Sequence, residues 1–121
     1  MKKLFAALLI LNFLLEAMVS AALIFSPVGV LSPGLGEQWS MHYGFAAFTI
    51  ATIGLWVWPV RHVPEIITAT IGILMTFHIA TLTSLTVAGD QQGGQILHGI
   101  LATMAVVLFV LRKRISEETP S

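Results

Sequence analysis

The chain has 121 residues, of which 56% are hydrophobic and only 10% are charged, and its formal net charge is zero. A water-soluble domain of this length could not bury so much apolar surface, so the composition excludes an ordinary soluble protein. The sequence contains no cysteine, which excludes disulfides and thiolate metal ligands.

Four long apolar segments follow one another, at residues 4–25, 41–60, 64–87 and 94–111. A membrane-spanning helix needs about 20 apolar residues at a rise of about 1.5 Å each, and all four segments qualify. The sequence therefore predicts an all-α membrane protein with a single four-helix transmembrane domain (1–121). Short connections favour an up-down-up-down bundle. Residues 112–121 are expected to form a short, disordered cytoplasmic tail.

The basic residues all fall on one side of this predicted topology, whereas the loops at 26–40 and 88–93 contain none. Loops rich in Lys and Arg stay in the cytoplasm. We therefore expect a multi-pass protein of the bacterial cytoplasmic (inner) membrane with both termini in the cytoplasm. The six basic residues are Lys2, Lys3, Arg61, Arg112, Lys113 and Arg114.

The first predicted span carries a carboxylate in its apolar centre. Asn12, Glu16 and Ser20 recur every four residues, so on a helix they form one polar stripe. An ionisable group at this depth costs roughly 2.5–3.5 kcal/mol on insertion scales. We therefore expect Glu16 to face a partner inside the bundle.

Histidines in the other three spans are the candidate partners. His78 and Glu16 are predicted about 13–14 Å from the outer ends of their helices, and His42 and His98 only about 2–6 Å from theirs. Helix ends read from sequence shift by a few residues, so these two levels can coincide. His62 lies in the cytoplasmic loop and does not belong to the set.

Three chemistries fit these residues, and the sequence does not separate them. Glu16, His42, His78 and His98 are usual ligand types for zinc, iron or copper. His42 and His98 could instead be axial ligands of a haem, although no basic residue lies on the outer side to pair with propionates. Glu16 with His78 could carry protons in a transporter. The same groups could also serve only to pack the helices.

Two families resemble the chain. Its length, four spans and Glu16 are similar to the small multidrug exporters, which implies proton-coupled export by an oligomer; the strong charge bias and His78 differ from that family. Ser26-Pro27 after the first span, Tyr43-Gly44 in the second and the glycine-rich turn before the fourth resemble DoxX-like bacterial four-helix proteins. That resemblance implies the four-helix fold and quinol or thiol redox work, and the lack of cysteine disfavours the thiol branch.

The leading hypothesis is a redox-linked accessory membrane protein that binds a transition metal or haem. A proton-coupled small-molecule transporter acting as an oligomer and a structural subunit of a larger membrane complex are the alternatives. Expected partners are the lipid bilayer, a quinone or a larger complex, and further copies of the chain, but no nucleic acid. Whether the chain is an enzyme stays open, because neither a nucleophile–base pair nor a multi-histidine oxygenase pattern is visible.

Overall fold

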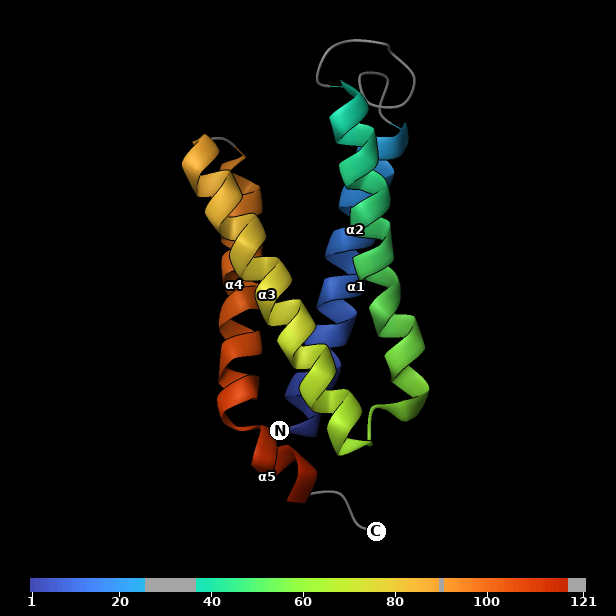
Figure 1. Cartoon of the computed structure of the whole chain (residues 1–121), viewed down its shortest axis with the longest axis vertical. Coiled ribbons are helices and arrows are strands. Elements are labelled where there is room, and N and C mark those ends of the chain that lie inside the picture. Colours follow the sequence, from blue (N-terminus) through green and yellow to red (C-terminus); the bar gives the residue numbers. More distant parts are fainter. Residues whose placement is uncertain (26–36, 90, 118–121) are drawn as a thin grey trace.

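The protein is a bundle of long helices in a computed structural model that describes residues 1–25, 37–89 and 91–117 (Figure 1). The long helices are α1 (Lys2–Phe25), α2 (Glu37–Val57), α3 (Pro64–Ala88) and α4 (Gln92–Val110). A short 3-10 helix (η1, Trp58–Val60) extends α2, and α5 (Arg112–Glu117) follows α4. The all-α prediction is confirmed, since the described ranges contain no strand.

Four helices are long and apolar enough to cross a membrane. Their apolar spans are Lys2–Phe25, Met41–Val60, Pro64–Ala88 and Gln92–Val110, close to the predicted bounds. The disorder expected for the tail is wrong for residues 112–117, because they form α5 and Ile115 is fully buried against the bundle. Residues 118–121 and the Ser26-Pro27 loop lie outside the described residues.

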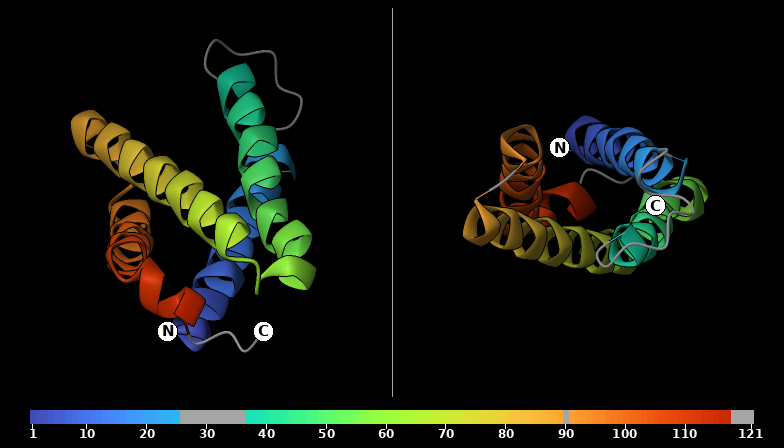
Figure 2. Two further views of the ribbon diagram at one scale, coloured as in Figure 1. Left: turned by 60° about the horizontal axis from the view of Figure 1, so that its bottom comes forward. Right: turned by 90° about the horizontal axis from the view of Figure 1, so that it is seen from above.

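The four long helices form two pairs, α1 with α2 and α3 with α4, and together they surround a common interior (Figure 2). The N-terminus and α5 lie at one end of the long axis, and the pairs diverge toward the opposite end (Figure 1). We call the end with the N-terminus and α5 the terminal end and the opposite one the far end.

Small residues let α1 and α2 pack closely. Gly44, Ala47, Ala51 and Gly54 are all buried and follow a 3-4-3 spacing, which places them on one face of α2. A Cβ added at Gly44 would lie 2.9 Å from Ile24 Cγ1. In lipid, helix association depends on such close packing, because there is no hydrophobic driving force between helices.

Apolar and polar side chains are distributed as in a membrane protein. Many large apolar side chains are exposed on the outside of the bundle, where lipid would cover them. Among the described residues, six polar or ionisable side chains are instead buried, and the buried apolar side chains form one cluster. The buried polar side chains are those of Asn12, Glu16, Ser20, Thr70, His78 and His98. The apolar cluster contains Phe5, Leu8, Leu9, Leu15, Ile67, Ile71, Leu74, Leu101, Ala105, Leu108 and Ile115.

Candidate metal centre

Three ionisable side chains from three helices meet inside the bundle: Glu16 of α1, His78 of α3 and His98 of α4. Glu16 and His78 are 0% exposed and His98 is 3% exposed. The Nδ1 atoms of the two histidines lie 2.9 Å apart. Glu16 Oε1 lies 3.9 Å from Nδ1 of His78 and 3.8 Å from Nδ1 of His98. We call these three residues the Glu–His–His group.

Asn12 holds His78 in the orientation that this group needs. The amide nitrogen Nδ2 of Asn12 donates to the backbone carbonyl of Ile50 on α2 at 3.0 Å. The amide oxygen therefore points the other way and lies 3.1 Å from Nε2 of His78. Because this oxygen only accepts, Nε2 carries the proton and a neutral His78 presents the Nδ1 lone pair to the group. All four long helices thus contribute to one polar network.

Glu16 lacks hydrogen-bond partners. Both carboxylate oxygens are buried and, within the part of the chain that the structure describes, neither makes a hydrogen bond. Buried polar atoms are nearly always hydrogen-bonded, and an uncompensated buried charge is strongly destabilising. A bound proton or a bound cation would therefore be needed to neutralise the Glu16 carboxylate.

The spacing of the three donor atoms suits a metal ion. One ligand atom from each residue can be chosen so that all lie within 4.8 Å of one another. A point in the plane of Glu16 Oε1 and the two Nδ1 atoms can lie about 2.1 Å from all three of these atoms. This distance is close to the Zn–N and Zn–O distances in proteins. The Glu–His–His group can hold a metal ion, with room in the ligand count for a further, exogenous ligand.

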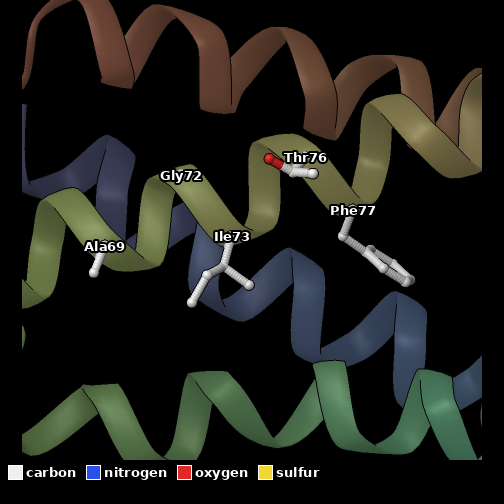
Figure 3. A pocket seen from close by; sticks show the side chains of 5 residues that line it. All are labelled: Ala69, Gly72, Ile73, Thr76 and Phe77. Atoms are coloured by element: carbon white, nitrogen blue, oxygen red, sulfur yellow. The ribbon is translucent and has the colours of Figure 1, made fainter.

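Phe77 covers the histidines on one side. Its ring centroid lies 5.2 Å from that of His78 and 6.1 Å from that of His98, in edge-on arrangements. The same side chain borders an open cavity of about 560 Å³ on one face of α3 (Figure 3). This cavity is lined by Ala69, Gly72, Ile73, Thr76 and Phe77. Phe77 thus contacts the two imidazoles and also lines this cavity.

A second cavity of about 740 Å³ lies among the four long helices and reaches His98. We call it the far-end cleft. Tyr43 of α2 and Thr81 of α3 border it. It is lined by Leu15, Met18, Val19, Ala22, Leu23, Tyr43, Ala80, Thr81, Ser84, Leu85, Gln91, Gly94, Leu97 and His98.

The fourth predicted ligand, His42, is placed differently. It is exposed on α2 and does not belong to the Glu–His–His group found among the described residues. The haem hypothesis needed His42 and His98 to face each other across the bundle. His98 instead contacts His78, and their ring centroids are 5.2 Å apart.

The sequence places Asn12 on the polar stripe but predicts no role for it at the site. The signal was present in the four-residue spacing, which puts Asn12 one turn from Glu16 on the same buried face. Ser20, the third member of the stripe, is also buried.

Comparisons with protein-family models, with curated proteins and with solved structures find no match to this chain.

Proposed function

We propose that this chain is an up-down-up-down protein of the bacterial inner membrane that binds a divalent transition metal through Glu16, His78 and His98. Both termini and α5 lie in the cytoplasm in this proposal, because all six basic residues belong to that side of the topology. One observation carries the proposal: three donor atoms from three helices form a triangle of metal-binding size, and one of them belongs to a buried carboxylate without hydrogen bonds.

The ligand set limits the choice of metal. Two imidazoles and a carboxylate occur in zinc sites and in non-haem iron(II) sites, both of which leave coordination positions open for water or a substrate. Copper(II) also accepts imidazole and carboxylate ligands. We favour a metal ion over haem because the two histidines contact each other directly.

The redox-linked accessory role rests on the proposed relationship to DoxX-like proteins. An iron or copper ion here would supply one-electron chemistry, whereas zinc would supply a Lewis acid. A quinone or a larger membrane complex is the proposed redox partner, and we propose that the chain acts as an oligomer.

Metal analysis of the purified protein tests the binding proposal. The full chain is prepared in detergent from metal-replete cells, and its bound metals and visible spectrum are recorded for the parent, His98→Ala and His42→Ala. We expect metal in the parent and in His42→Ala, and loss of it in His98→Ala. A colourless, metal-free parent that also fails to take up added Zn²⁺, Fe²⁺ or Cu²⁺ would contradict the proposal.

Proton-coupled transport is the second candidate. It is favoured by the 3.9 Å separation between Glu16 and His78 and by the far-end cleft beside them. In this mechanism the Glu16 carboxyl group takes up and releases the coupling proton. Proton-driven flux in vesicles should then stop in Glu16→Gln, and flux that continues in this variant would remove the candidate. If neither metal binding nor flux is found, a structural role in a larger complex becomes the best explanation.

A further inference from the structure

The far-end cleft and the Glu–His–His group meet at one residue, His98. His98 lines the cleft and contributes a donor atom to the group, whereas the side chains of Glu16 and His78 are fully buried and do not line it. An ion that reaches the group through the cleft would therefore contact His98 first.

One wall of the cleft offers polar groups in sequence. Thr81 and Ser84 are three residues apart on α3 and so lie on the same face. Gln91, the residue that precedes α4, lies seven residues before His98, about two turns or roughly 10 Å. Hydroxyl and amide oxygens along this wall can replace water molecules of a hydrated cation one after another. We call Thr81, Ser84 and Gln91 the polar track.

The part of the lining that α1 contributes is apolar and includes Leu15, Val19 and Ala22. Among the residues that the structure describes, no charged side chain lines the cleft.

The cleft lies toward the far end of the bundle. Its lining includes Leu23 near the end of α1 and Gln91 and Gly94 at the beginning of α4. The N-terminus and α5 lie at the other end (Figure 1). With the termini in the cytoplasm, the cleft opens toward the extracytoplasmic side.

We propose that the far-end cleft is the path by which a hydrated divalent cation moves along the polar track between the extracytoplasmic side and the Glu–His–His group. The inference rests on the proposed metal site and on the proposed orientation. It adds a direction of exchange: the site takes its metal from, or returns it to, the outside rather than the cytoplasm.

Thiol labelling tests the exposure and direction of the cleft. Because the chain contains no cysteine, Ser84→Cys would carry its only thiol. A charged, membrane-impermeant maleimide should label this variant in right-side-out membranes and not in sealed inverted vesicles. Thr83→Cys is the matched control, since Thr83 is the exposed neighbour on α3 that does not line the cleft, and we expect it to resist the reagent in lipid.

Association kinetics test whether the cleft is the path. Ser84→Trp should slow Zn²⁺ association with the purified full chain about tenfold, because a large ring obstructs the polar track. The dissociation constant at equilibrium should change by less than about twofold, since Ser84 is not a ligand. Thr83→Trp should leave both quantities unchanged.

The outcomes separate the two proposals. A parent chain that binds no Zn²⁺, Fe²⁺ or Cu²⁺ contradicts the metal site itself. If the parent binds Zn²⁺ but Ser84→Cys is labelled only in inverted vesicles, the proposed direction is wrong. If a folded Ser84→Trp binds Zn²⁺ as fast as the parent does, the proposed path is wrong. If Ser84→Trp does not fold, the labelling of Ser84→Cys decides: failure to label from outside contradicts the inference.

Discussion

The Nε2 atom of His78 lies 3.1 Å from the amide oxygen of Asn12, and this contact determines that Nδ1 of His78 faces Glu16 and His98. Metal-binding histidines commonly donate their second ring N–H to a carbonyl or carboxylate, which fixes the ring and its tautomer. Here the amide oxygen of Asn12 accepts from the second ring N–H of His78. The orientation of Asn12 is in turn fixed by its hydrogen bond to the Ile50 carbonyl.

Replacing Asn12 should weaken metal binding without removing a ligand. Asn12→Leu keeps a similar volume but cannot accept from His78, so we expect Zn²⁺ affinity to fall about 10–100-fold. Competition with a fluorescent chelator measures the change. Ser20→Ala, which removes a buried hydroxyl two turns further along the same stripe, is the control and should bind like the parent. Equal affinities of Asn12→Leu and the parent would refute the orienting role.

Glu16→Gln should separate stability from binding. The substitution preserves shape and removes a buried carboxylate whose oxygens make no hydrogen bond, so the metal-free protein should unfold with a free energy that is unchanged or higher by about 1 kcal/mol. Zn²⁺ affinity should fall sharply, because a ligand and a negative charge are lost. Thermal unfolding in chelator and Zn²⁺ titration give the two readings. A variant that is strongly destabilised without metal would show that the carboxylate holds the bundle together.

Much of this site could be predicted from the sequence. A four-residue spacing on a helix places Asn12, Glu16 and Ser20 on the same face. In an apolar environment this polar face is expected to be buried in the bundle. The meeting of Glu16 with His78 follows from their equal depth. These inferences depend on helical periodicity and on the number of residues from each helix end, both of which a single sequence contains.

The depth of His98 and the rotation of α2 were harder to predict. His98 lies six residues after the start of α4, whereas His78 lies ten before the end of α3. The two residues meet because α3 extends about one turn beyond α4. His42 is two residues from Gly44, about 200° around the helix from the small-residue face that packs on α1. The 3-4-3 spacing of those small residues was the signal that could have placed His42 outside the site.

The close approach of α1 and α2 gives a prediction on stability. Gly44→Ala should destabilise the protein by about 1–3 kcal/mol, since the added Cβ would lie 2.9 Å from Ile24 Cγ1 and 3.0 Å from Leu23 Cβ. Gly72→Ala is the matched control: nothing lies within 4 Å of its added Cβ, and alanine favours the helix. Thermal unfolding in detergent compares them. Identical behaviour of the two variants would argue against the packing described for α1 and α2.

Metal binding should weaken as the pH falls. Imidazole nitrogens and carboxylate oxygens bind metal only when they carry no proton, so protons compete with the ion for the same atoms. We expect Zn²⁺ affinity to decrease steadily between about pH 8 and pH 6, with protons released into the buffer on binding. Calorimetry in buffers of different ionisation enthalpy measures the released protons. Affinity that is independent of pH would indicate a site built from other groups.

The most direct measurement is X-ray absorption spectroscopy of the Zn²⁺-loaded full chain. We expect two imidazole nitrogens and at least one oxygen at about 2.0–2.1 Å from the metal. The imidazole contribution should be lost or halved in His98→Ala and kept in His42→Ala. A spectrum without imidazole ligands, or one that is the same in the parent and His98→Ala, would contradict the assignment of Glu16, His78 and His98 as the metal centre.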